Sequence, residues 1–181
     1  QKLNDFTLTN KFIENDKIKW IKIFLNESRA KNMKIRYCQK EDLEAIYKLI
    51  CELEECNLNH EQFALVYENK LNDEKSHYLV AVSDDMIVGF VSVNIDYQLH
   101  HENKVATIEE LVIDNSYRGN GIGRLLVDFS TKLALEHQCE VIELTSNFKR
   151  IEAHQFYQKN DFIKSSYKLI KVLKDSDQVG I

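Results

Sequence analysis

Apolar residues recur at regular spacings from residue 33 onward, and these spacings predict alternating strands and helices. The short run "KIRYC" (34–38) predicts a strand, and the apolar positions of residues 43–53 recur every three or four residues, as in a helix. A second helix is predicted to begin at Asn59, because Gln62 three residues later completes a capping box. The predicted buried face of this helix contains Phe63, Val66 and Tyr67.

The rest of the chain predicts a hairpin and then alternating strands and helices. Two β-rich runs within residues 77–96 flank the turn residues Asp84 and Asp85. The elements predicted after them are a strand at 106–114, a helix at 125–133, a strand at 139–147, a helix at 150–160 and one or two strands at 162–173. This order predicts a mixed α/β (α+β) fold with a hairpin-rich first half and a β-α-β second half.

Residues 1–32 differ from the rest of the chain and are rich in Lys, Ile and Asn. Ile18, Ile21 and Leu25 would lie on one apolar face of a helix. We therefore divide the chain into an N-terminal extension of unknown role (1–32), one domain (33–175) and a short tail (176–181).

The composition is that of an ordinary globular protein, with 44% hydrophobic and 29% charged residues. A net charge of −5 gives no overall attraction to nucleic acid or to an anionic membrane. No apolar run approaches the roughly 20 residues that span a bilayer, and Lys2, Asp5 and Lys11 interrupt any signal-peptide pattern. The cysteines contain no Cys-x-x-Cys pair, so reduced thiols and a cytoplasmic location are expected.

Three glycines stand at every second position in "YRGNGIGRLL" (117–126), in a chain with only 5 glycines. Their place between an apolar strand and a predicted helix is typical of a loop that binds a phosphate group. A P-loop would need Lys and then Ser or Thr after its last glycine, whereas Arg124 and Leu125 follow Gly123. The even spacing does not fit a dinucleotide-binding fingerprint. A tight turn without a ligand is the alternative, but it would not need the flanking arginines.

The pattern Arg118-x-x-Gly121-x-Gly123 resembles the pyrophosphate loop of the GCN5-related N-acetyltransferases (GNAT), and the resemblance extends over residues 34–173. It implies a central, mostly antiparallel twisted sheet that is flanked by helices and splayed between its fourth and fifth strands. It also implies acetyl-CoA as co-substrate, with the diphosphate on the loop and the pantetheine arm paired with the splayed strand. The residues implied in coenzyme binding are Leu111, Val112, Ile113, Arg118, Gly119, Asn120, Gly121, Ile122, Gly123, Arg124 and Asn147.

Tyr157, in the segment "AHQFYQKNDF", matches the A-x-x-F-Y pattern of this family. The resemblance implies that this tyrosine stands near the coenzyme sulfur and protonates the departing thiolate, a role that suits a phenol. A half-buried packing role is the alternative. Relatives usually have Gly before the aromatic residue that follows this helix, whereas Asp161 precedes Phe162 here. Asp tolerates the left-handed backbone that such a helix end needs.

The base that takes a proton from the attacking amine is expected on the strand "ATIEELVI". Relatives often have a carboxylate at the position of Thr107, and a threonine cannot act as this base. Strict alternation would place Thr107, Glu109 and Leu111 on one face and Glu110 on the other, unless a bulge intervenes. Glu109 is therefore the expected base or water-holding residue, ahead of Glu110, and a solvated or salt-bridged strand residue is the alternative for either glutamate.

Within the family, the chain most resembles the aminoalkylphosphonate N-acetyltransferases, in "AIYKLICELEE", "NHEQFA", "YQLHHEN" and "ELTSNFKRIEAHQFY". The expected acceptor-site residues are Thr107, His100, Lys149 and Arg150. A cationic pair would suit a phosphonate or another small anion. The pair His100–His101 could bind the divalent metal associated with those relatives, although the sequence assigns no metal ligand. An exposed hairpin end and a solvated loop are the alternatives.

The sequence thus predicts an acetyl-CoA-dependent N-acetyltransferase that acts on a primary amine of a small molecule, by direct transfer in a ternary complex. An aminoalkylphosphonate or another anionic amine would be the acceptor. A peptide or protein N-acetyltransferase is one alternative, and a non-catalytic acyl-CoA-binding regulatory module is another. Thr107 favours the regulatory module, and Tyr157 favours the enzyme. No nucleic-acid or membrane partner is expected, and the sequence is compatible with a homodimer.

Overall fold

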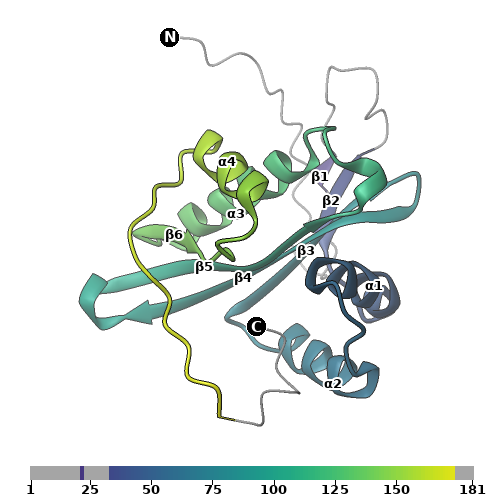
Figure 1. Ribbon diagram of the computed structural model, residues 1–181, viewed down its shortest axis with the longest axis horizontal. Coiled ribbons are helices and arrows are strands. Elements are labelled where there is room, and N and C mark those ends of the chain that lie inside the picture. The colour runs from purple at the N-terminus through teal and green to yellow at the C-terminus, as the bar shows by residue number, and fades with distance from the viewer. Residues whose placement is uncertain (1–20, 23–32, 174–181) are drawn as a thin grey trace.

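The computed structural model describes residues 21–22 and 33–173, which form a six-stranded sheet with helices on both faces (Figure 1). The strands are β1 (Ile21–Lys22), β2 (Lys34–Tyr37), β3 (Ser76–Ser83), β4 (Met86–Gln98), β5 (Asn103–Ile113) and β6 (Val141–Leu144). The helices are α1 (Leu43–Glu54), α2 (His60–Leu71), α3 (Ile122–Glu136) and α4 (Ile151–Lys159). The 3-10 turns are η1 (Lys40–Asp42), η2 (Leu99–His101) and η3 (Asn115–Tyr117).

The strands follow one another across the sheet in the order β1-β2-β3-β4-β5-β6, and only one pair is parallel. β5 pairs with β6 from Val105–Val141 to Ile108–Leu144. β5 then continues to Ile113, whereas β6 ends at Leu144, so the two strands diverge. They are the fourth and fifth strands when β2 is counted as the first. The predicted mixed fold and its splayed strands are therefore confirmed.

Each face of the sheet has its own apolar core. Because side chains alternate along a strand, β4 contributes Val91 and Val93 to the core beneath α3 and Phe90 to the core beneath α1 and α2. Figure 1 shows α1 and α2 on one side of the sheet and α3 and α4 on the other. No helix among the described residues is long and apolar enough to cross a membrane.

Two local predictions are confirmed, and one is wrong. Asp84 and Asp85 have φ values of 47° and 64°, as a tight hairpin turn requires. The Asn59 side chain accepts a 2.9 Å hydrogen bond from the backbone N–H of Gln62 at the start of α2. Val66 is 47% exposed and not buried as predicted. Helix α2 packs against both α1 and β3, and Tyr67 is its one buried residue.

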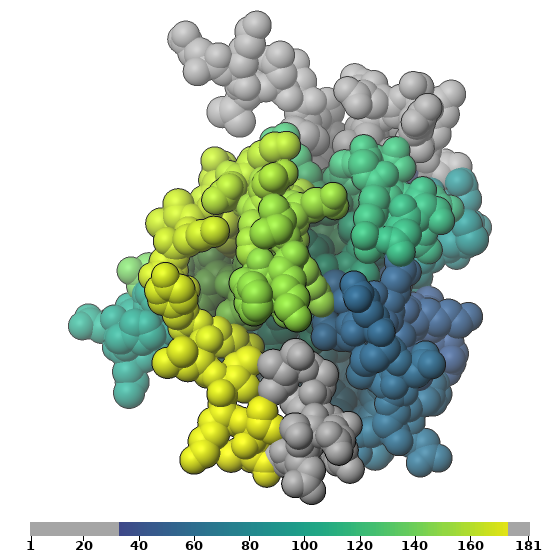
Figure 2. Space-filling view, viewed as in Figure 1, coloured from purple at the N-terminus to yellow at the C-terminus, as the bar shows by residue number. Residues whose placement is uncertain are grey.

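The strands predicted at 162–173 are also absent from the described structure. This segment runs along the surface (yellow in Figures 1 and 2). Its exposed apolar side chains are Ile163, Tyr167, Leu169, Ile170, Val172 and Leu173. Alternating apolar residues form a strand only where the backbone meets a partner edge, which the sequence pattern does not supply. Ile21 lies in β1 and not in a helix, whereas Ile18 and Leu25 lie outside the described residues.

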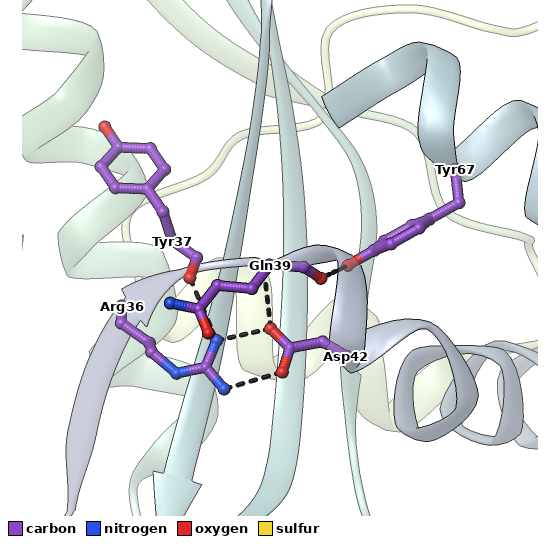
Figure 3. A network of polar contacts seen from close by, with 5 residues as sticks. All are labelled: Arg36, Tyr37, Gln39, Asp42 and Tyr67. Carbon is purple, nitrogen blue, oxygen red and sulfur yellow. Dashed lines mark hydrogen bonds and ion pairs between the residues drawn. The ribbon is translucent and has the colours of Figure 1, made fainter. Parts of the chain in front are cut away.

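A buried ion pair joins the end of β2 to the start of α1 (Figure 3). Arg36 makes a two-pronged contact with the carboxylate of Asp42, with 2.8 Å between Nη2 and Oδ1. The same carboxylate accepts a 2.8 Å bond from the backbone N–H of Gln39, and the Tyr67 hydroxyl donates to the Gln39 carbonyl at 2.8 Å. The network therefore ties β2, α1 and α2 together.

We expect Asp42→Ala to lower the free energy of unfolding by about 3 kcal/mol, because it removes the carboxylate partner of a buried arginine. The side chains of Arg36 and Asp42 are only 12% and 7% exposed. Urea denaturation measures the change. Glu68→Ala is the matched control, since it breaks the Lys40–Glu68 pair, whose side chains are 75% and 55% exposed. The control should lower the free energy of unfolding by less than about 1 kcal/mol. Equal losses in the two variants would show that the Arg36–Asp42 pair contributes no more than an exposed one.

Candidate active site

Strand β5 carries a β-bulge where it leaves β6. Val93 of β4 pairs with Ile108, but the next residue back, Ser92, pairs with Glu110. Glu109 is therefore an extra residue in β5. The bulge follows directly after Ile108, the last residue that pairs with β6.

The bulge overturns the alternation predicted for this strand. Leu111 packs with the core beneath α3, whereas Val112 is buried in the core beneath α1 and α2. Glu110 lies on the face of Val112, and so does Thr107, because Ile108 next to it is buried beneath α3. Thr107 and Leu111 therefore lie on opposite faces, and it is Glu110 that shares the face of Thr107.

Glu110 is fixed by the serine opposite it. The Ser92 side chain is 0% exposed, and its Oγ accepts a 2.9 Å hydrogen bond from the backbone N–H of Glu110. The Ser92 hydroxyl also donates to Oε2 of the Glu110 carboxylate. Glu109 is exposed beside it. The carboxylate with a defined position is thus that of Glu110.

The surroundings of Glu110 favour a proton acceptor. Burial raises the pKa of its carboxyl, and the hydrogen bond from Ser92 opposes this effect. The carboxylates of Glu109 and Glu54 raise the pKa further, and Lys70 lowers it. A carboxylate with a raised pKa can accept a proton closer to neutral pH than an exposed one.

The loop between β5 and α3 turns on two glycines with left-handed backbone. Gly119 and Gly121 have φ values of +78° and +79°, and no atom lies within 4 Å of where a Cβ would stand. Gly121 is the N-cap of α3, and no side chain caps this helix. The first N–H groups of α3 therefore face outward at the positive end of the helix dipole, an arrangement that suits a diphosphate.

The other loop side chains are held by local contacts. The Arg118 guanidinium donates from Nε to the Ile113 carbonyl at 3.2 Å, and its Nη2 lies 3.8 Å from Oε1 of Glu52. Arg124 is exposed on the first turn of α3. Ile122 is 2% exposed, so only its backbone could reach a ligand.

Gly123 has a packing role. A Cβ atom at this position would lie 3.2 Å from Cζ and 3.3 Å from Cε2 of Phe156 in α4. Phe156 precedes Tyr157, whose ring packs against Phe156 and Phe162 at centroid distances of 5.3 and 5.8 Å. After α4 the chain passes through Asp161 with φ +65°, the left-handed conformation expected there. One close contact thus couples the glycine loop to the helix that carries Tyr157.

A second contact joins α4 to α1. Arg150 donates from Nη2 to the Leu53 carbonyl at 2.8 Å, and the same nitrogen lies 3.3 Å from Oε1 of Glu54. Figure 2 shows α4 (yellow-green) and α1 (dark blue) side by side on this face. Burial raises the pKa of the Tyr157 hydroxyl, and Arg150 opposes this. Arg150 and Glu54 are in contact, and their charges act on the pKa of Tyr157 and of Glu110, respectively.

The histidine pair lies elsewhere. His100 and His101 are in η2, at the tip of the β4–β5 hairpin, with ring centroids 4.3 Å apart. His101 Nδ1 is 3.0 Å from Oε2 of Glu140. Asn103, next to the tip, is roughly 20 Å along the strand from Glu110. Among the described residues, no group of three or more His, Cys, Asp or Glu side chains is placed to hold a metal ion.

The remaining predicted residues lie in the loop before α4. Lys149 is exposed, with Nζ 5.9 Å from the centroid of the Phe148 ring. The Asn147 side chain accepts a 3.0 Å bond from the backbone N–H of Lys149, and its carbonyl accepts one of 3.0 Å from Nε2 of His154. Asn147 therefore shapes the loop that leads from β6 to α4.

Sequence reasoning missed Ser92 and Glu54. A lone serine among buried apolar residues, as in "FVSVN", indicates a specific hydrogen bond, and this signal was available. Nothing in the sequence places Glu54 near Glu110, because the two are joined only through the packing of α1 on the sheet.

Comparison with known proteins agrees with this arrangement. The sequence pattern of the "Acetyltransferase (GNAT) family" matches residues 43–162. This chain belongs to that family. The matched region begins at α1 and ends after α4, so it includes the diverging strands, the glycine loop and Tyr157. The predicted family is confirmed, and the chain is an N-acetyltransferase.

Individual relatives cover most of the chain. The aminoalkylphosphonate N-acetyltransferase of Salmonella typhimurium is 33% identical over 139 residues, which are 77% of this chain and 90% of that protein. An uncharacterized N-acetyltransferase of Archaeoglobus fulgidus is 30% identical over 135 residues, which are 71% of this chain and 92% of that protein. The crystal structure of a transcriptional regulator from Bacillus halodurans covers 78% of this chain and 99% of its own, with a TM-score of 0.70 and 26% identity.

We expect Gly123→Ala to lower the free energy of unfolding by about 1–3 kcal/mol, because the added methyl group meets the Phe156 ring. In an exposed helix the same change would stabilise the protein by about 0.5–1 kcal/mol. A loss of stability therefore indicates that the added methyl group meets Phe156. Urea denaturation measures it. In a Phe156→Leu background the substitution should become neutral or stabilising. Stabilisation by Gly123→Ala with Phe156 intact would show that the two helices do not touch there.

Proposed function

We propose that this N-acetyltransferase transfers the acetyl group of acetyl-CoA to a primary amine of a small molecule, directly and in a ternary complex. The observation that carries the proposal is the arrangement around the divergence of β5 and β6. β5 loses its β6 partner after Ile108, Glu110 stands just beyond that point, and the glycine turn at the start of α3 is open. We propose that Tyr157 acts beside them.

The glycine loop and the free edge of β5 suit acetyl-CoA as the acetyl donor. Gly119 and Gly121 leave open space over the loop, and the N–H groups at the start of α3 would bind the diphosphate. Arg118 lies beside the loop and would add a positive charge. Beyond Ile108, the β6 side of β5 has no partner strand among the described residues, so its backbone groups would pair with the pantetheine arm.

The proposed reaction needs one proton acceptor and one proton donor. The amine nitrogen attacks the carbonyl carbon of the thioester, and the carbon–sulfur bond then breaks. The Glu110 carboxylate takes the proton that the amine loses, and the Tyr157 hydroxyl gives a proton to the departing thiolate. A backbone N–H near Val112 would polarise the carbonyl oxygen. We propose Glu110 in place of Glu109 because only Glu110 has a fixed position.

The acceptor is proposed to be a small amine, as the name of the Salmonella relative suggests. An aminoalkylphosphonate would need cations for its phosphonate group. Of the two expected cations, Arg150 already contacts Glu54, and Lys149 is exposed. A phosphonate would therefore have to compete with Glu54 for Arg150.

A thiol-release assay with acetyl-CoA tests the proposed function. The panel contains a 2-aminoalkylphosphonate, a neutral amine of the same length, a diamine and a short peptide with a free amino group. We expect release of coenzyme A with at least one of the small amines. Turnover of the peptide alone would favour a peptide N-acetyltransferase, and no turnover with any amine would overturn the proposal.

We expect Gly121→Asp to weaken acetyl-CoA binding by a hundredfold or more, measured by isothermal titration calorimetry. The new carboxylate would face the diphosphate, and two such like charges in contact cost about 3 kcal/mol or more. Gly121→Asn is the matched control, because it has the same size, tolerates the left-handed backbone comparably and carries no charge. If both variants bind the coenzyme like the unchanged protein, the loop is not the diphosphate site.

We expect Glu110→Gln to abolish the acid limb of the kcat/KM profile and to lower its plateau by about 10²–10⁴-fold, the usual contribution of a general base. Activity of the unchanged enzyme should fall as the pH drops through the raised pKa of Glu110, since the protonated form cannot accept a proton. Glu109→Gln should move this limb to lower pH, because the Glu109 carboxylate raises the pKa of Glu110. The reverse pattern would identify Glu109 as the base.

A further inference from the structure

The buried hydroxyl of Ser92 has no part in the reaction as proposed so far. Ser92 stands between Val91 and Val93 in the middle of β4, and all three residues are at most 1% exposed. A hydroxyl group in such surroundings costs free energy unless it is hydrogen-bonded. Both hydrogen bonds of the Ser92 hydroxyl group run to one residue, Glu110.

The bulge explains the first of these bonds. Because Glu109 interrupts the regular pairing of β4 and β5, the backbone N–H of Glu110 binds the Ser92 Oγ atom at 2.9 Å. A hydroxyl that accepts a bond in this way still has its own hydrogen to donate. It donates it to Oε2 of Glu110. A single hydroxyl therefore holds both the backbone and the carboxylate of Glu110.

We propose that Ser92 is a positioning residue for proton transfer: it fixes the Glu110 carboxylate in one orientation and stabilises its ionised form. The proposal rests on the proposed function, in which Glu110 takes the proton from the acceptor amine. Ser92 itself is buried beneath Glu110 and touches neither the amine nor the coenzyme.

The charges around Glu110 show why such a donor is needed. The charged and titratable groups that face Glu110 from neighbouring elements are Glu109 on β5, Glu54 on α1, Lys70 on α2 and Tyr78 on β3. Two of them are carboxylates that disfavour the ionised form, and the cation Lys70 also lies 3.6 Å from Asp73. Ser92 thus offsets part of the repulsion with a directed hydrogen bond to a charged group, the stronger kind.

A purely structural role for Ser92 makes a different prediction. If Ser92 served only to satisfy the N–H group freed by the bulge, its removal would lower stability and leave the ionisation of Glu110 unchanged. If Ser92 is a positioning residue, its removal must raise the pKa of Glu110, because the ionised form loses a donor. The titration of Glu110 separates the two roles.

The test is a ¹³C NMR titration of the glutamate carboxyl groups in the full chain, with the Glu110 signal assigned by Glu110→Gln. We expect Ser92→Ala to raise the pKa of Glu110 by about one unit, the equivalent of one hydrogen bond to a charged group. Ser130→Ala is the matched control, since Ser130 is also 0% exposed and donates at 2.8 Å to the Leu126 carbonyl. The control should leave Glu110 unchanged. An unchanged pKa in Ser92→Ala would overturn the proposal.

Kinetics with the best amine of the panel form the second part of the test. In Ser92→Ala the acid limb of the kcat/KM profile should move to higher pH by the same amount as the Glu110 pKa measured by NMR. Ser92→Thr keeps the hydroxyl group and should return the limb to its original pH. A limb that stays in place while the NMR pKa moves would overturn the positioning role and leave the transferase function standing. No turnover by the unchanged enzyme with any amine would instead overturn the proposed function, and with it this role, whatever the titration shows.

Discussion

The parallel pairing of β5 and β6 ends after Ile108 and Leu144, and the rest of the site depends on this end point. From Val105 to Ile108, β5 is paired with a strand on both sides and its side chains alternate between the two faces of the sheet. Beyond it, β5 is bonded to β4 alone, and one extra residue, Glu109, fits into the strand. The unpaired edge and the bulge follow at once, and the glycine turn begins at Gly119, before the start of α3. The proposed donor, base and acid sites all lie around this stretch.

Two close contacts keep the stretch together with its surroundings. Gly123 allows α4 to approach α3 at Phe156, and Arg150 fastens the start of α4 to the end of α1. The first contact is apolar and depends on the absence of a side chain, while the second depends on charge. Because one contact holds Arg150 at the N-cap of α4 and the other holds Phe156, the residue directly before Tyr157, a displacement of either one would move Tyr157 relative to Glu110. The site is thus sensitive to packing at residues that need not touch a substrate.

Much of the fold and of the donor loop could be predicted from the sequence. Helix caps, the hairpin turn at Asp84 and Asp85 and the Gly-rich turn depend on neighbouring residues, so local patterns were sufficient. The strands expected at 162–173 and the burial of Val66 were wrong, because pairing and burial depend on what the rest of the chain places nearby. The spacing of apolar residues indicates whether a segment is a helix or a strand, but it does not indicate which other segment covers it or pairs with it.

The residue order by itself determined the family, the order of the elements from β2 to α4 and the glycine loop, since each is encoded within a short stretch of chain. Only the tertiary structure distinguishes Glu109 from Glu110, because it alone shows which of the two carboxylates is held in place. The two are adjacent and chemically alike, and the choice depends on a one-residue offset in the register between β4 and β5. That offset places Glu110 opposite Ser92, a residue 18 positions away, and no local pattern encodes such a pairing. A bulge is set by the balance of two packed cores, which exists only in the folded chain.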